Sequence, residues 1–247
     1  MRNIFSKMPL AAAAFVFAAA LAVTACGGNG APGGGGLGET LTLSGRVYTV
    51  GIDWQTMGMT YTPVTGDLAV TILPQVGTGQ IAAGQLNLTL GTPTAAQMGR
   101  ISAYLFGSGW DNVTITPDDA LSAQPWFNTP DGDLVREYNR TTISGTTLRT
   151  TGRSVRYVFV DRDVAVRGTG TTNEEDGFRY TTRSFNFTLR KGWNALHLLT
   201  EGSINVATET ANVTMTLSLS NPGSPLRWVI LDDGDWDDWE FSSRIRR

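Results

Sequence analysis

Apolar and polar side chains alternate along most of the chain after residue 39. In Gln85–Leu90 the three leucines stand at every second position, and polar side chains stand between them. The same period of two recurs in Leu41–Val47, Ser184–Leu189 and Val213–Leu219. A period of two places the apolar side chains on one face of a strand and the polar ones on the other, as in a half-buried antiparallel sheet.

Two denser apolar runs, Val155–Val160 and Leu226–Leu231, predict more buried, central strands. Few segments favour a helix. Residues 94–106, after Pro93, are expected to form about three helical turns, and Pro117–Ser122 about one turn capped by Thr116. The pattern therefore predicts an all-β fold, mainly an antiparallel β-sandwich, with one or two short helices in the middle.

Composition divides the chain into four parts. Residues 1–25 are expected to be a signal peptide, 26–38 a lipidated cysteine and glycine-rich tether, 39–231 a β-rich domain, and 232–247 a charged tail. The β-rich part is one domain, or two β-rich halves, 39–92 and 151–231, joined by a mixed segment. The sequence leaves both possibilities open.

The amino-terminal segment has the pattern of an export signal. Arg2 and Lys7 precede an uncharged apolar run, Met8–Val23, which is short for a membrane-spanning helix. Val23-Thr24-Ala25-Cys26 resembles a lipobox, the recognition site of bacterial lipoprotein processing. This resemblance implies a diacylglycerol thioether on Cys26 and cleavage before it. Cys26 is the only cysteine, so no intramolecular disulfide is possible.

The segment after Cys26 is expected to be a flexible tether. Residues 27–38 contain eight glycines in twelve positions, a composition typical of a coil with a reach of roughly 20 Å. Enterobacterial sorting, by resemblance, marks retention at the inner membrane with Asp after the cysteine. Gly27 stands there instead, which favours the outer membrane or cell surface, with the periplasmic side as the alternative.

Four short motifs carry a further resemblance: Ser44–Tyr48, Gly84–Leu86, Tyr157–Asp161 and Leu189–Asn194. In this order they resemble a group of uncharacterised bacterial lipoproteins, over roughly residues 40–231. The resemblance implies a location in the cell envelope and a β fold. It implies no activity and no site residue.

The charge of the chain excludes one class of partner. The formal net charge is −3, and removal of the leader makes it more negative, because Arg2 and Lys7 are the only charged residues there. A mildly acidic protein lacks the basic surface that nucleic-acid binding requires. We expect no nucleic-acid partner.

Catalysis that depends on histidine would have to use His197, the only histidine. It alternates with Leu196 and Leu198, so it is interpreted as an ordinary strand residue on the face opposite these leucines.

No G-x-S-x-G nucleophile motif occurs in the sequence. The nearest match, Phe106–Trp110, has Phe106 and Trp110 where the motif requires its two outer glycines. One histidine and a lipidated cysteine do not supply a zinc site. We expect no catalytic residue and no cofactor.

Two groups of acidic residues are candidate sites. Asp233, Asp235 and Asp237 have the spacing of the first EF-hand ligands, but the required glycine and final glutamate are missing, so a solvated acidic tail is the simpler interpretation and no metal is expected. Asp161 and Asp163, two apart on an expected strand, share a face as glycosidase carboxylates must, yet a surface charge pair is simpler.

Seven tryptophans are many for this length, and exposed ones can stack on sugar rings. Trp228 is assigned to the core, Trp193 to a hairpin end, and Trp236 and Trp239 to a cap or an exposed pair. The remaining tryptophans are Trp54, Trp110 and Trp126.

The sequence thus predicts a lipid-anchored envelope lipoprotein, held at a membrane through Cys26, with a noncatalytic binding or structural role. Its partner is expected to be a glycan or an envelope protein. The alternatives are a carbohydrate-binding or cell-wall-binding module that uses exposed tryptophan, and a carboxylate-dependent hydrolase.

Overall fold

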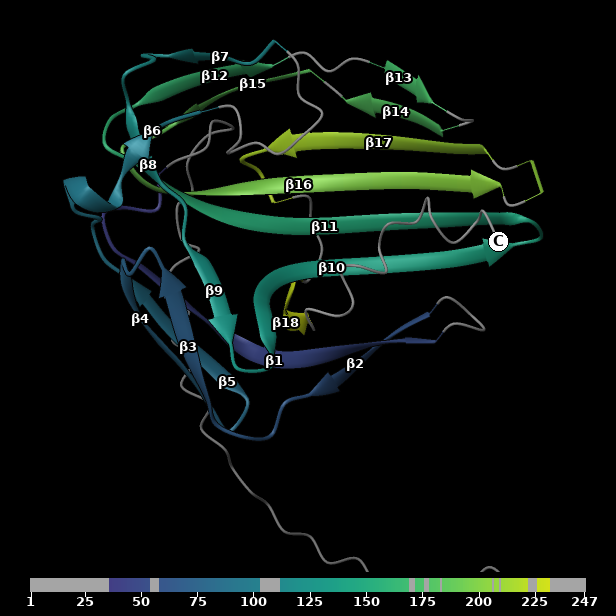
Figure 1. Cartoon of the computed structure of the whole chain (residues 1–247), viewed down its shortest axis with the longest axis horizontal. Coiled ribbons are helices and arrows are strands. Elements are labelled where there is room, and N and C mark those ends of the chain that lie inside the picture. Colours follow the sequence, from purple (N-terminus) through teal and green to yellow (C-terminus); the bar gives the residue numbers. More distant parts are fainter. Residues whose placement is uncertain are drawn as a thin grey trace, which may run out of the picture.

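The structure, a computed structural model, describes residues 36–53, 58–102, 112–168, 172–175, 178–182, 184–205, 207–208, 210–221 and 226–231 (Figure 1). The described residues form strands and one 3₁₀ turn, η1. The strands are β1 Leu41–Asp53, β2 Gly58–Pro63, β3 Leu68–Leu73, β4 Gly77–Ala82, β5 Gln85–Leu90, β6 Gly99–Arg100, β7 Thr114–Thr116, β8 Leu121–Ala123, β9 Trp126–Thr129, β10 Gly132–Ser144, β11 Thr147–Val160, β12 Val164–Gly168, β13 Thr172–Glu175, β14 Phe178–Thr182, β15 Phe185–Leu189, β16 Gly192–Asn205, β17 Thr210–Ser218 and β18 Arg227–Leu231.

The all-β prediction is confirmed, and most neighbouring strands are antiparallel. The parallel pairs among the described strands are β1 with β18 and β14 with β17. The alternating segments form β1, β5, β15 and β17, as the pattern predicts. In β5 the three leucines are buried and the residues between them are exposed.

Part of the large sheet closes on itself. The hydrogen-bonded order β10-β18-β1-β5-β4-β3-β9 returns to its start because β9 also pairs with β10. The ring encloses a cluster of buried apolar side chains. Its members include Val47, Leu88, Phe127, Trp193 and Trp228.

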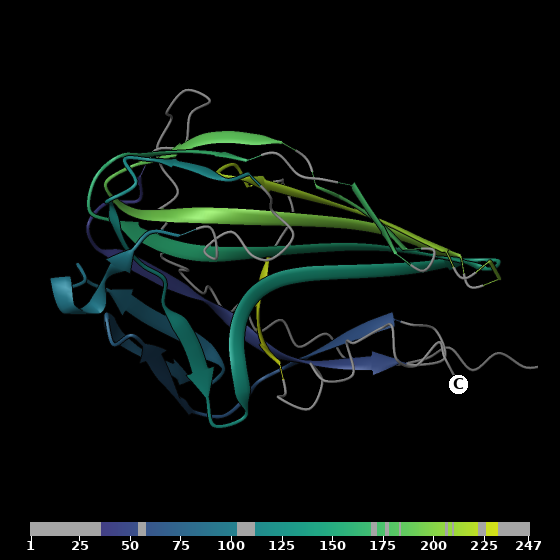
Figure 2. The ribbon, with the colours of Figure 1, turned by 45° about the horizontal axis from the view of Figure 1, so that its top comes forward.

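A smaller sheet, β15-β12-β7, covers the other face of the long strands (Figure 2). A second buried cluster lies beneath it, with Val158 and Val160 from β11 and Val164 and Leu189 from the small sheet. Side chains alternate across a strand, so Tyr157 and Phe159 of β11 join the ring cluster instead. This two-sided burial explains the dense apolar run of β11 and makes the arrangement sandwich-like.

Strands from both ends of the β-rich region belong to one sheet. β1 pairs with β18 at Val47↔Trp228, and β18 pairs with β10 at Arg136↔Trp228. The ring cluster likewise draws on residues before 92 and after 151. Residues 39–92 and 151–231 therefore share hydrogen bonds and a core.

The end of the glycine-rich segment is fixed to the body, although its composition predicts a coil through residue 38. Leu37 N–H donates to Trp193 O and Trp193 N–H donates to Gly38 O, both at 2.7 Å. Gly192 has φ +96, and a Cβ there would collide with the Gly38 carbonyl oxygen. A glycine is therefore required where the two segments meet.

The prediction of a helix over residues 94–106 is wrong for the part that is described. Only Ala95–Gln97 turn, as η1, and Gly99–Arg100 then pair with β8 as β6. Ile101 is buried in the second cluster and its N–H donates to Ala120 O. The tertiary partners of this segment thus outweigh a helix that contains Gly99, because a short isolated helix is marginal on its own.

The helical turn predicted for Pro117–Ser122 is also wrong. A turn spans residues 118–119, and Leu121–Ala123 become β8, which pairs with the end of β11. Ala120 is fully buried in the second cluster. Across the described residues, no helix has the length and apolar character to cross a bilayer.

Candidate functional site

A cavity lies where β10 separates from β11. The two strands pair from Ser144↔Thr147 to Arg136↔Val155. Beyond this point β10 bends away to pair with β9, and β11 continues straight to pair with β8 (Figure 2). The fork leaves a cavity of about 180 Å³, named here the fork pocket. Its lining consists of Gln124, Pro125, Trp126, Phe127, Asp133, Leu134, Val135, Arg136, Glu137, Ser154, Val155, Arg156, Tyr157 and Trp228.

Arg136 is the central cation of the fork pocket. It lies opposite Val155 and Trp228 in the sheet, so its side chain shares the inner face with them. Its Nη1 donates to the Tyr157 hydroxyl at 2.8 Å, and its guanidinium carbon lies 5.8 Å from the Trp228 ring centroid. No carboxylate among the described residues forms an ion pair with Arg136, and its buried Nε has no acceptor there.

The aromatic side chains that contact Arg136, Tyr157 and Trp228, also pack against each other. Tyr157 and Trp228 stack with centroids 6.4 Å apart and planes at 23°. Phe127 meets Trp228 edge to face at 6.1 Å. The arrangement combines flat apolar walls with a guanidinium, which is typical of sites that hold a planar ligand by its faces and one polar end.

Glu137 lies on the opposite face of β10 and is also buried. Its Oε1 accepts a hydrogen bond from Asn139 Nδ2 at 2.8 Å. Burial raises the pKa of this carboxyl to about 7, an effect that the Asn139 hydrogen bond partly opposes. A buried carboxyl that titrates near neutrality in a cavity marks a candidate functional residue.

Next to Glu137, two tyrosines enclose Arg227. The Arg227 guanidinium carbon lies 4.5 Å from the Tyr61 ring centroid and 5.7 Å from that of Tyr48. The Tyr61 hydroxyl donates to Asn139 O and accepts from Asn139 N–H, each at 3.3 Å, which ties β2 to β10. Burial raises the pKa of Tyr61, so the phenol stays protonated and available for these bonds.

His197 occupies the strand position that the alternation predicts. It pairs with Val155 across β16 and β11, and it is 8% exposed. Burial, together with the positive charge of Arg136, lowers the pKa of His197 to about 4. The ring is therefore neutral at pH 7, and its Nδ1 has no partner among the described residues.

The tryptophans differ in burial in a way that the sequence does not show. Trp228 is in the core, as predicted, and Trp193 is fully buried at the start of β16. Trp126 is 57% exposed at the edge of the fork pocket and pairs with Leu73, which is 54% exposed. Trp54, Trp110, Trp236 and Trp239 lie outside the described residues.

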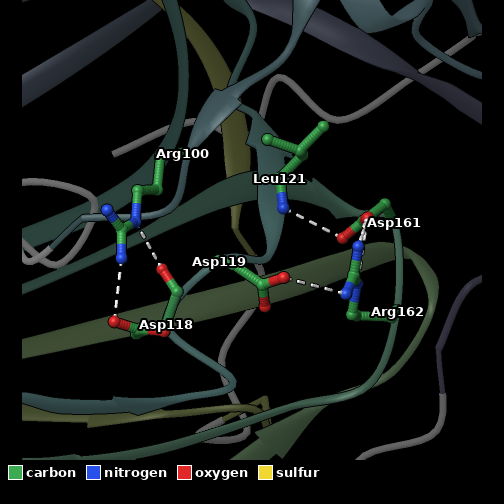
Figure 3. Close-up of polar contacts among 6 residues, drawn as sticks. All are labelled: Arg100, Asp118, Asp119, Leu121, Asp161 and Arg162. Atoms are coloured by element: carbon green, nitrogen blue, oxygen red, sulfur yellow. Dashed lines mark hydrogen bonds and ion pairs between the residues drawn. The ribbon is translucent and has the colours of Figure 1, made fainter.

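Asp161 and Asp163 do not form a catalytic pair. Both lie in the turn between β11 and β12, not on a strand. Asp161 accepts from Leu121 N–H at 2.9 Å and forms an ion pair with Arg162 at 2.8 Å, and Arg162 also reaches Asp119 (Figure 3). Asp163 accepts from Arg190 and from Lys191 N–H.

These contacts favour the charged form of both aspartates. Hydrogen bonds from Arg162 and from the Leu121 backbone lower the pKa of Asp161, despite partial burial. The Lys191 N–H and then Arg190 lower the pKa of Asp163. A general acid needs a raised pKa, so the arrangement fits a structural clamp at the end of the sheet. A similar ion pair between Arg100 and Asp118, at 2.8 Å, fixes β6 to the turn at residues 118–119, whose Asp119 is the residue that Arg162 reaches (Figure 3).

Several predicted sites fall outside the described residues. They are the signal peptide, Cys26, and the acidic tail with Asp233, Asp235 and Asp237. Within the described ranges, no group of three or more potential metal ligands occurs.

Sequence reasoning missed Arg136 and Glu137. One signal was present: Arg136 follows Leu134 at the inward position of an alternating strand, where an apolar side chain is expected. Nothing local marks Glu137, because its burial comes from distant strands.

Comparison with family models, with curated proteins and with solved structures found no match to this chain.

Proposed function

We propose that this protein is a lipid-anchored envelope lipoprotein whose β domain has a noncatalytic binding role. The motif Val23–Cys26 carries the anchoring part, because a basic start and a short apolar leader precede it as in an export signal, and a glycine-rich segment follows it. Two or more acyl chains at Cys26 would hold the domain durably, since one chain anchors only marginally. The outer membrane or cell surface is the proposed location.

The binding role is supported by the fork pocket. Its walls combine stacked aromatic rings with Arg136, which has no carboxylate partner among the described residues. Ligand sites are usually preformed concavities with mainly apolar walls and a few polar groups. The carboxylate pair that a hydrolase would use, Asp161 and Asp163, is instead held in local ion pairs.

Lipidation is tested with the full chain in a bacterial host supplied with an alkyne-bearing fatty acid. We expect label on the wild-type protein and a mature mass that begins at Cys26. Cys26→Ser should remove the label and leave the leader attached. Thr24→Ser is the matched control, because it keeps a small residue in the motif and should be labelled. Unlabelled wild-type protein, or a bare residue 26, contradicts the anchor.

Carbohydrate binding is a second candidate, favoured by the exposure of Trp126 beside Leu73. An exposed indole face is a typical platform for a sugar ring. With a panel of cell-wall glycans we expect a change in tryptophan fluorescence that Trp126→Ala abolishes and Trp126→Phe partly keeps. Absence of any change across the panel, or an unchanged response in Trp126→Ala, argues against this role.

A further inference from the structure

We propose that the fork pocket binds a small carboxylate with a single six-membered ring, the carboxylate on Arg136 and one face of the ring against Tyr157 and Trp228. This inference rests on the proposed binding role and extends it to a ligand class. It does not depend on lipidation, so the ligand proposal and the lipid anchor can fail separately.

The cation is the first argument. Arg136 has five N–H donors, of which the Tyr157 hydroxyl accepts one, and no described carboxylate neutralises it. A partly buried cation without a counter-ion is costly. A carboxylate matches the guanidinium fork with two parallel hydrogen bonds, so it supplies both the missing charge and the missing acceptors.

The second argument is the shape and size of the cavity. The stacked Tyr157 and Trp228 rings, with Phe127 at their edge, form flat apolar walls. The cavity holds about 180 Å³. A protein cavity of roughly 150 Å³ accommodates benzene, so this one fits one six-membered ring with a carboxylate but not a second ring.

The remaining charged groups of the lining are compatible with an anion. Arg156 also lines the cavity, is half-buried and adds no negative charge. Asp133 accepts from Asn128 Nδ2 at 2.8 Å. Glu137 has a pKa of about 7, so most of this carboxyl is uncharged at pH 6. Binding is therefore best measured at pH 6.

Two kinds of ligand share this chemistry: an aromatic acid and a sugar acid. The probes are benzoate and glucuronate, each titrated to about 10 mM into the full chain in mild detergent by calorimetry, since millimolar affinity is expected of so small a ligand. Benzamide and glucose are the uncharged counterparts. We expect at least one carboxylate to bind about tenfold more tightly than its counterpart, because a charge-assisted bond is lost. Binding of benzoate identifies the ligand as an aromatic acid, and binding of glucuronate identifies it as a sugar acid.

Arg136→Gln should weaken this binding at least about tenfold, and Arg136→Lys should weaken it less, because lysine keeps the charge but not the planar fork. Arg149→Gln, at an exposed position on the neighbouring strand β11, is the control and should bind as the wild type does. If Arg136→Gln fails to fold, the lysine variant decides. Failure of both carboxylates to bind overturns the proposal. So does equal binding of an uncharged counterpart, or wild-type affinity in the folded Arg136 variants.

Discussion

Trp193→Ala is expected to lower the free energy of unfolding by about 3–5 kcal/mol, the largest loss among the substitutions considered. Trp193 is fully buried in the ring cluster and meets Phe159 edge to face at 5.5 Å. Its Nε1 also donates to Gly91 O at 3.2 Å, so the variant leaves a cavity and a carbonyl without its donor. Urea denaturation measures the loss, and the melting temperature should fall by roughly 10 °C.

Trp126→Ala is the matched control for Trp193→Ala, because it removes the same side chain from an exposed position. Its cost should stay within about 0.5 kcal/mol, as for most surface substitutions. Equal losses at the two positions would contradict the burial on which the ring core depends.

Glu137→Gln is expected to stabilise the protein by about 3 kcal/mol at pH 8 and to change little at pH 4. The pKa of Glu137 rises from 4.5 to about 7 on folding, so the folded state binds this proton more tightly than the unfolded state does. The stability contributed by Glu137 is thus fully present below pH 4.5 and is lost as the pH rises through 7. Each pKa unit corresponds to about 1.4 kcal/mol.

In Glu137→Gln, the glutamine keeps a side-chain carbonyl oxygen that accepts the hydrogen bond from Asn139, and it removes the ionisable carboxyl group. The measurement is the difference in unfolding free energy between variant and wild type at each pH. His197 has its own pH dependence, since its pKa falls to about 4 on folding and stability is lost as the pH drops below 6.5. That contribution is common to both proteins and cancels. Glu201→Gln, at an exposed position, should show no gain at pH 8; a loss of stability in Glu137→Gln would contradict the predicted effect.

The two failed helix predictions show where local sequence misleads. Residues 94–102 and 117–122 have local features of helices, yet their backbone groups pair with strands distant in the chain. Ile101 and Ala120 are buried in the second cluster, which residues from β11, β12 and β15 largely build. A preference of a few tenths of a kcal/mol per residue does not outweigh such burial.

The sequence by itself determined the all-β class, the alternating strands β1, β5, β15 and β17, and the deeper burial of β11. Each follows from a period that a strand imposes on its own residues, so no knowledge of distant partners is needed. The assignment of Trp228 to the core follows from the same kind of local run.

Only the tertiary structure decided the closure of the ring, the fork between β10 and β11, and the contrast between buried Trp193 and exposed Trp126. It also decided that Arg136 would face aromatic rings without a counter-ion among the described residues and that Glu137 would be buried. The reason is physical: alternation says which side chains share a face, but the charge, solvent and cavity that a face meets come from strands far away in the chain.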